Sequence, residues 1–100
     1  MKIAIVRGTV VSTQKEPSLG GSRLLLVQFI GADGEPISDC EVATDSVGAG
    51  EGEWVLVTLG SGARQIYSDR PRPVDALVVG IIDTVSVDKQ LLYSKRDRDR

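Results

Sequence analysis

Histidine is absent from this sequence of 100 residues, and cysteine occurs only once, at Cys40. Without histidine the chain lacks the commonest general base and the commonest metal ligand, so catalytic triads that depend on histidine are excluded. A single cysteine excludes an intrachain disulfide and a cysteine-based zinc site, and it fits a reducing cytosol. These absences count against catalytic and metal-binding roles that depend on histidine or on pairs of cysteines.

Aromatic residues and excess positive charge are also scarce. Twelve basic residues face fourteen acidic ones, for a net charge of -2, and aromatic residues make up 4% of the chain. Nucleic-acid binding needs a basic surface, and binding of single strands also needs exposed aromatic rings. Phe29 and Trp54 stand within apolar segments, so we expect them to pack in a core. The composition therefore argues against a nucleic-acid partner.

Long apolar runs are missing as well. No run approaches the roughly 20 residues that a membrane-spanning helix needs. The first residues also lack the apolar stretch of a signal peptide. The sequence therefore predicts a cytoplasmic protein with no membrane segment.

The apolar residues that are present occur in short runs, as is typical of β-strands. Strands are expected over residues 3–11, 24–30, 39–42, 54–59 and 76–87, with bends at Gly8 and Gly80. Asp33-Gly34 and the glycine-rich segment 45–52 predict turns between strands, and Asp88-Lys89 predicts another. Residues 91–93 are interpreted as a short apolar segment after the last strand.

Five short strands with glycine-marked bends are typical of a small all-β barrel of the OB type. A parallel α/β fold would need crossover helices, and the sequence predicts none. We expect one barrel domain over residues 1–93 and a charged C-terminal tail without stable structure over residues 94–100.

Two of the expected strands, 24–30 and 77–82, are apolar on both faces. Because a single barrel has only one interior, some of these side chains must meet another surface. Self-association would cover them, and so would loops of the same chain. The sequence favours self-association.

Three further patterns were weighed as sites. The glycines of segment 48–52 lead into a strand rather than a helix, which favours a tight turn over a phosphate loop. The acidic residues do not have the spacing of a calcium loop, so a solvated face is the better interpretation; they are Asp33, Glu35, Asp39, Glu41 and Asp45. Arg64, Arg70 and Arg72 are interpreted as ion-pairing or subunit-interface residues, and Asp45 is a further interface candidate. Segment 60–64 alone is most simply a loop.

Several segments resemble, in order, the pentameric vertex proteins of bacterial microcompartments, the CcmL/EutN family. The resemblance covers residues 1–95 and rests on segments 2–15, 45–50, 60–65 and 74–83. Segment 91–95 and the opening segment are more similar to the carboxysome member than to the ethanolamine member. The resemblance implies an OB-like barrel that assembles as a cyclic homopentamer.

The resemblance also implies a role: a structural protein that is not an enzyme and that holds no cofactor or metal. The pentamer is expected to occupy the fivefold vertices of the carboxysome shell of a cyanobacterium, among hexameric shell proteins, and to supply curvature and closure. The shell is expected to enclose RuBisCO and carbonic anhydrase. A Gly-Ser pair lines a narrow central pore in the family; here it corresponds to Gly60 and Ser61, followed by Gly62 where alanine or serine is expected.

Two other functions stay open on the residues alone. A monomeric OB-fold protein could bind single-stranded nucleic acid or a small ligand, although the low aromatic content counts against it. An inactive regulatory subunit of a larger enzyme is the weaker alternative.

Overall fold

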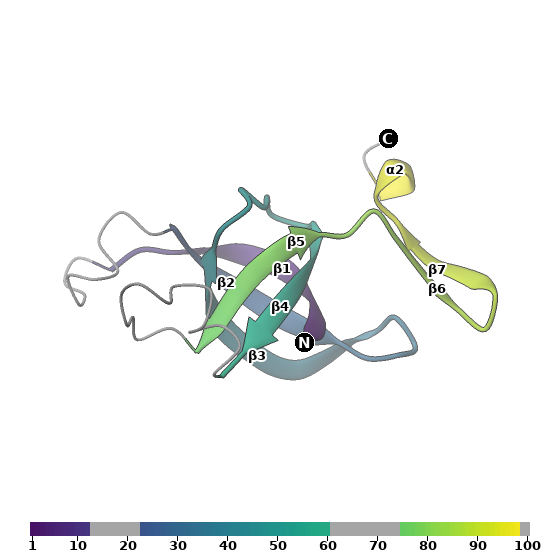
Figure 1. Cartoon of the computed structure of the whole chain (residues 1–100), viewed down its shortest axis with the longest axis horizontal. Coiled ribbons are helices and arrows are strands. Elements are labelled where there is room, and N and C mark those ends of the chain that lie inside the picture. Colours follow the sequence, from purple (N-terminus) through teal and green to yellow (C-terminus); the bar gives the residue numbers. More distant parts are fainter. Residues whose placement is uncertain (13–22, 61–74, 99–100) are drawn as a thin grey trace.

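A closed barrel of five strands forms the body of the protein. The structure is a computed structural model that describes residues 1–12, 23–60 and 75–98. The barrel strands are β1 (Lys2–Val10), β2 (Arg23–Ile30), β3 (Pro36–Asp45), β4 (Trp54–Leu59) and β5 (Ala76–Ile81). They close in the order β1-β2-β3-β5-β4, as Figure 1 shows. The predicted all-β, five-stranded barrel is therefore confirmed.

The pairing is antiparallel except at one seam. Neighbours β1–β2, β2–β3, β1–β4 and β4–β5 are antiparallel, whereas β3 and β5 are parallel. The parallel seam is short, because only Thr44 and Asp45 of β3 pair with β5. Among the described strands, the first half of β3 therefore pairs with β2 alone.

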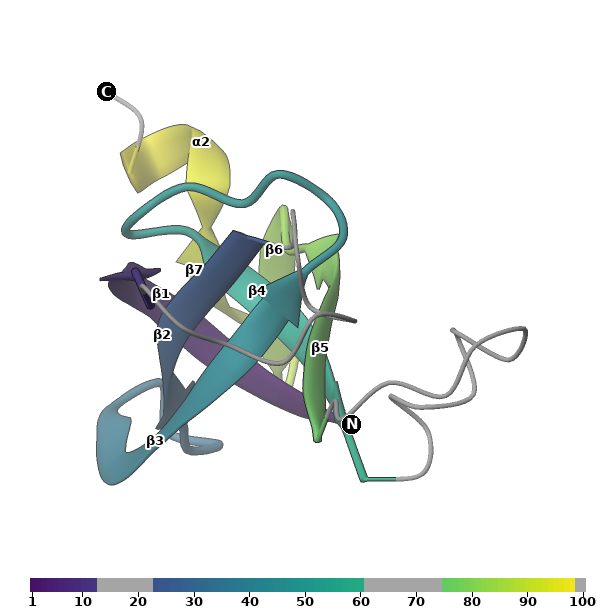
Figure 2. The same cartoon turned by 90° about the vertical axis from the view of Figure 1, so that its left-hand side faces the viewer.

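Strand alternation divides the apolar residues between the inside and the outside of the barrel. The inner core holds the small and branched side chains that a narrow barrel can enclose, and all are buried: Ala4, Val6, Leu25, Val27, Phe29, Ala43, Ala49, Val55, Val57, Ala76 and Val78. Gly8 follows a register shift in the β1–β2 ladder, which confirms the predicted bend. The view in Figure 2 looks through this barrel.

A second unit stands beside the barrel. Strands β6 (Thr84–Val87) and β7 (Gln90–Ser94) form an antiparallel hairpin that is not part of the barrel sheet, as Figure 1 shows. The sequence predicted a single strand over residues 76–87, which was wrong at Ile82 and Asp83. There the chain leaves the barrel: the Ile82 backbone N–H donates to the Trp54 carbonyl (2.8 Å), and the Lys95 N–H donates to the Asp83 carbonyl (2.9 Å).

The predicted turns are confirmed at both hairpins. Asp33-Gly34 joins β2 to β3, and Gly34 has a φ of 83°, which a residue with a Cβ rarely adopts. Asp88 and Lys89 join β6 to β7 with φ values of 52° and 65°. Two positive φ values in a two-residue loop define a type I′ turn.

A short helical element follows the hairpin. A single helical turn, α2, spans Lys95–Arg98 directly after β7. Its first residue is held by the backbone bond to Asp83 in the link between β5 and β6 and by an ion pair to Glu53, the residue before β4. The domain boundary at residue 93 stays a prediction.

Candidate functional site

All the predicted pore and interface residues except Asp45 fall in the sequence between β4 and β5. Gly60, which ends the turn after β4, has a φ of 61°, and its N–H donates to the Asp75 carbonyl (2.8 Å). The bond ties the two residues that flank segment 61–74. Ser61, Gly62, Arg64, Arg70 and Arg72 lie outside the described residues, so their predicted roles stay predictions.

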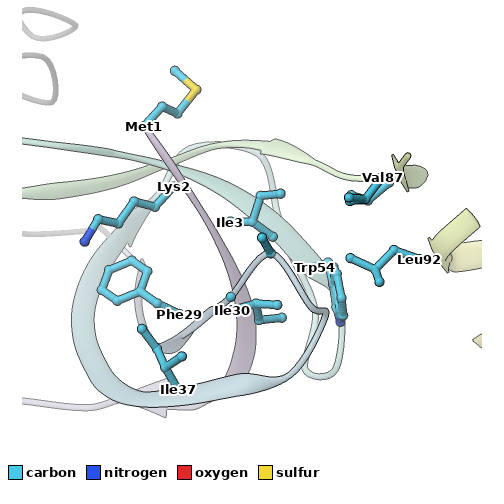
Figure 3. A pocket seen from close by; sticks show the side chains of 12 residues that line it. Met1, Lys2, Ile3, Phe29, Ile30, Ile37, Trp54, Val87 and Leu92 are labelled. Carbon is cyan, nitrogen blue, oxygen red and sulfur yellow. The ribbon is translucent and has the colours of Figure 1, made fainter. Parts of the chain in front are cut away.

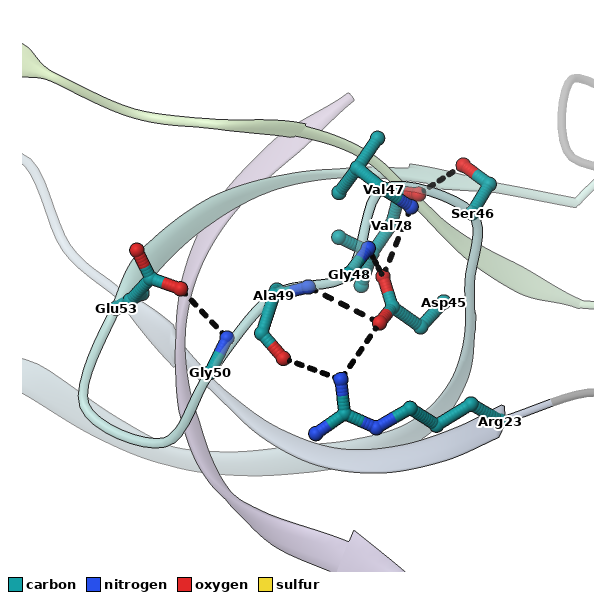
Figure 4. A network of polar contacts seen from close by, with 9 residues as sticks. All are labelled: Arg23, Asp45, Ser46, Val47, Gly48, Ala49, Gly50, Glu53 and Val78. Carbon is teal, nitrogen blue, oxygen red and sulfur yellow. Dashed lines mark hydrogen bonds and ion pairs between the residues drawn. The ribbon is translucent and has the colours of Figure 1, made fainter.

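Asp45, the remaining interface candidate, organises the loop between β3 and β4 (Figure 4). Its carboxylate accepts hydrogen bonds from three successive backbone N–H groups, those of Val47, Gly48 and Ala49, at 3.0–3.1 Å. It also forms an ion pair with Arg23 of β2 (3.2 Å). The Asp45 side chain is only 1% exposed, so within one subunit its carboxylate serves the loop.

Arg23 completes this network. Its Nη1 donates to the Asp45 carboxylate and also to the Ala49 carbonyl (2.8 Å), so one guanidinium joins β2 to both ends of the loop segment 45–49. Gly48 has a φ of 77°, which places its N–H toward the carboxylate without the strain of a Cβ. The glycines of this segment therefore build a turn between strands, as predicted, and the turn is held by a side chain of β3.

The same loop is connected to the hairpin through Glu53. Its Oε1 accepts from the Gly50 N–H (2.6 Å), and its Oε2 pairs with the Lys95 Nζ (2.7 Å). Two hydrogen bonds hold the pKa of Glu53 below its ordinary value of 4.5: the larger effect comes from Lys95 and the smaller from the Gly50 backbone. Partial burial acts in the opposite direction. A polar path therefore runs from β2 through the loop to the end of the hairpin.

Beside this ion pair the hairpin packs on the outer face of β1 and β4. Tyr93 of β7 stacks on Trp54 of β4, with ring centroids 4.2 Å apart. Ile5, Trp54, Ile82 and Tyr93 are buried there, and partly buried residues surround them: Ile3, Ile30, Leu56, Val85 and Leu92. The same chain therefore covers part of the outer apolar surface, which was the alternative to self-association.

An apolar cleft of about 490 Å³ separates the rest of the hairpin from the end of the barrel, as Figure 3 shows. Val87 and Leu92 line it from the hairpin, and Ile3, Phe29 and Ile37 line it from the barrel. The indole Nε1 of Trp54, which also lines this cleft, is buried and lacks a hydrogen-bond partner within the described chain. The walls of this cleft are mostly apolar, and Lys2 is the charged residue among those that line it.

The outer face of β2 and β3 is not covered by the hairpin. Leu26 and Val42 lie opposite each other in the ladder and are 37% and 46% exposed. Ile37, at the beginning of β3, is 44% exposed but belongs to the cleft and not to this face. This apolar surface is what the two-faced strand 24–30 predicted, and loops of the described chain leave it open.

The described residues were also searched for metal-binding clusters and membrane-spanning helices. No group of three or more His, Cys, Asp or Glu side chains is placed to hold a metal ion within these ranges. Asp33, Glu35 and Asp39 are exposed, which fits the predicted solvated face. In the part of the chain that the structure describes, no helix has the length and hydropathy to cross a membrane.

Comparisons with known proteins agree with this geometry. The family model described as "Ethanolamine utilisation protein EutN/carboxysome" matches residues 1–83. The chain belongs to the EutN/CcmL family. It is 59% identical over 100 residues to the carboxysome shell vertex protein CcmL of Gloeobacter violaceus, with all of both chains covered. It is 56% identical over 90 residues to the microcompartment shell vertex protein PduN of Salmonella typhimurium, covering 86% of this chain and 99% of PduN.

Solved structures of EutN/CcmL proteins have the same fold. The Gloeobacter violaceus CcmL structure matches with a TM-score of 0.91 at 60% identity, covering 97% of this chain and 100% of that chain. GrpN of Rhodospirillum rubrum, a pentameric microcompartment shell protein, matches with a TM-score of 0.79 at 46% identity, covering 87% of this chain and 100% of that chain. The resemblance identified from the sequence is therefore confirmed.

Sequence reasoning missed the contacts that fix the hairpin. Tyr93 was assigned to a short apolar segment, and Glu53 and Lys95 were not singled out. The apolar residues of 91–93 directly after the Asp88-Lys89 turn were the available signal, because a turn between two β-rich segments predicts a hairpin. The partners of Tyr93 and Lys95 are far away in the sequence, so no local pattern indicated them.

Proposed function

We propose that the protein is a structural subunit of the carboxysome shell, not an enzyme, which assembles as a homopentamer and caps the fivefold vertices. The supporting observation is the match to carboxysome shell vertex proteins at 59% identity over the full length of both chains. The apolar outer face of β2 and β3 supplies a physical reason for assembly, since water contact with that face is unfavourable.

The mechanism is geometric. A sheet of hexagonal units is flat and cannot close, and a unit of five at each corner introduces the curvature that closes it. A ring forms when one surface of a subunit fits a different surface of the next and the rotation between them closes after five steps. The protein itself then contributes shape and contacts, and no bond is made or broken.

The surroundings that follow from this role are also proposals. The pentamer would be bordered by hexameric carboxysome shell proteins, in the cytoplasm of a cyanobacterium, and the shell would enclose RuBisCO and carbonic anhydrase. Gly60, Ser61 and Gly62 would line a narrow pore on the fivefold axis. Arg64, Arg70 and Arg72 would contribute to the subunit interface, and Asp45 would act through the loop that it holds.

The first test is the number of subunits in solution. Native mass spectrometry of the full chain should give five subunits, and a monodisperse monomer at micromolar concentration would contradict the proposal. Removing the protein from its parent cell should leave carboxysomes elongated or open, whereas closed polyhedral shells would contradict the vertex role.

The pore is tested separately. Ser61→Trp should leave the pentamer intact and occlude the channel in a structure of the ring. A solved ring with residue 61 far from the fivefold axis would end the pore assignment without affecting the proposed vertex role.

A further inference from the structure

The first half of β3 has a free edge. It pairs with β2 from Pro36 onward, but only its last two residues, Thr44 and Asp45, pair with β5. Residues 36–40 are exposed, so within the described chain nothing lies along this edge. The backbone groups of an open strand edge are ready to pair with another chain.

The β6–β7 hairpin also has an exposed side. It packs on the barrel through Val85, Leu92 and Tyr93, whereas Leu91 is 59% exposed and Ser86, its partner across the ladder, is also exposed. A two-stranded ribbon is marginally stable alone and gains from a further strand or an apolar surface. One side of the hairpin therefore lacks a partner among the described residues of its own subunit.

The charges of the two surfaces are opposite. Segment 31–41, which includes the free half of β3, contains four acidic residues and no basic one: Asp33, Glu35, Asp39 and Glu41. The hairpin and the beginning of α2, residues 84–96, contain three basic residues and one acidic one: Lys89, Lys95, Arg96 and Asp88. Opposite charges steer two surfaces together and disfavour contact of either surface with its own copy.

The exposed apolar side chains occur on the same two surfaces. Three of the seven large hydrophobic residues that are exposed in the described subunit lie there: Leu26 and Val42 on β2 and β3, and Leu91 on the hairpin. A cyclic ring needs two different surfaces on each subunit, one for each neighbour. The free half of β3 and the outer side of the hairpin form such a pair.

We propose that, in the ring, the β6–β7 hairpin of one subunit docks on the free half of β3 of the next subunit. The proposal rests on the pentamer proposed above. This hairpin contact acts as a clamp between neighbouring subunits.

The single cysteine gives a direct test, because Cys40 is exposed and lies on the free half of β3. Ser86→Cys places a second thiol beside Leu91 on the outer side of the hairpin. Treatment of the full-length pentamer with a short bismaleimide should then link each subunit to the next and give a ladder of up to five subunits under denaturing conditions. Glu51→Cys, a matched exposed position in the β3–β4 loop, should not give the ladder.

The outcomes separate the clamp from the ring itself. If native mass spectrometry shows five subunits but Ser86→Cys gives no ladder, the clamp is wrong and the pentamer stands. Links that persist after Cys40→Ser, or that stop at two subunits, also overturn the clamp, because they require a different or symmetric contact. A monomer in native mass spectrometry before any cross-linking overturns the proposed pentamer instead.

A second measurement does not depend on cross-linking. Leu91→Asp places a carboxylate against the acidic free half of β3. Rings of this variant should dissociate on dilution already at a subunit concentration about tenfold or more above that of the wild type. Val11→Asp, at an even more exposed apolar residue outside both surfaces, should leave that concentration unchanged. Unchanged Trp54 fluorescence would show that Leu91→Asp still folds, and equal dissociation of the two variants would overturn the clamp.

Discussion

Tyr93 lies flat against Trp54, with their ring planes inclined by only 13°. The two residues belong to different units, Tyr93 to the hairpin and Trp54 to the first position of the barrel strand β4. Because the neighbouring residues Glu53 and Lys95 also pair, the hairpin is attached by one stacked pair and one ion pair side by side. The stack is buried and the ion pair is partly exposed, so most of the attachment energy is expected from the rings.

Replacing Tyr93 tests this distribution. Tyr93→Ala removes a buried ring and leaves a cavity beside Trp54, and it should lower the free energy of unfolding by about 3 kcal/mol. Tyr93→Phe keeps the stack and should cost less than about 1 kcal/mol. Urea denaturation at one fixed protein concentration, followed by Trp54 fluorescence, measures both. Equal losses for the two variants would show that the hydroxyl, not the ring, matters.

The ion pair predicts a dependence of stability on pH. The folded state lowers the pKa of Glu53 below 4.5, so the pair stabilises above that value and its contribution disappears as the pH falls through the lower, folded pKa. Because both side chains are partly exposed, the contribution at neutral pH should not exceed about 1 kcal/mol. Glu53→Gln still accepts from the Gly50 N–H and removes only the charge.

The stability difference between wild type and Glu53→Gln should therefore be largest at neutral pH and vanish in acid. Added salt should reduce it at neutral pH, since partly exposed charges are screened. A difference that stays constant from neutral pH into acid would assign the effect to packing rather than to charge.

The barrel could be predicted because the sequence patterns that specify its strands and turns are local. Short apolar runs, the bend at Gly8 and the turn at Asp33-Gly34 each depend on neighbouring residues, and each appears in the structure where it was expected. The two-faced apolar pattern of strand 24–30 also indicated that a single interior was insufficient. The structure divides that surplus between a part that the hairpin covers and a part on β2 and β3 that stays open.

The hairpin was not predictable in the same way. Segment 76–87 is β-rich throughout, and its break at Ile82 and Asp83 is fixed by bonds to Trp54 and Lys95, which are distant in the sequence. Of the predicted site residues, only Gly60 and Asp45 lie within the described chain. Asp45 illustrates the limit: its acidic neighbours suggested a solvated face, but its own carboxylate is buried because Arg23 and three backbone N–H groups surround it.

That surrounding makes Asp45 a strong determinant of stability. Asp45→Asn has the same size, but its amide NH₂ faces backbone N–H donors, and it should lower the free energy of unfolding by about 2–3 kcal/mol. Arg23→Met keeps the three backbone bonds and should cost about 1 kcal/mol, because this guanidinium is 47% exposed. Urea denaturation compares them, and a larger loss for Arg23→Met would show that the ion pair, not the loop, is decisive.

The β6–β7 turn offers a stabilising change. Asp88 and Lys89 both have positive φ values, which are unfavourable for most residues with a Cβ. Asn tolerates this conformation and Gly has no Cβ, so Asn-Gly adopts a type I′ turn readily. Asp88→Asn with Lys89→Gly should raise the free energy of unfolding by about 1 kcal/mol. Asp88→Asn with Lys89→Ala is the matched control, because it removes the same two charges and keeps the Cβ at residue 89, and it should give no gain. Thermal denaturation distinguishes them: an equal increase for the Asn-Ala variant would attribute the gain to the loss of the charges, and no increase for the Asn-Gly variant would show that the turn carries no strain.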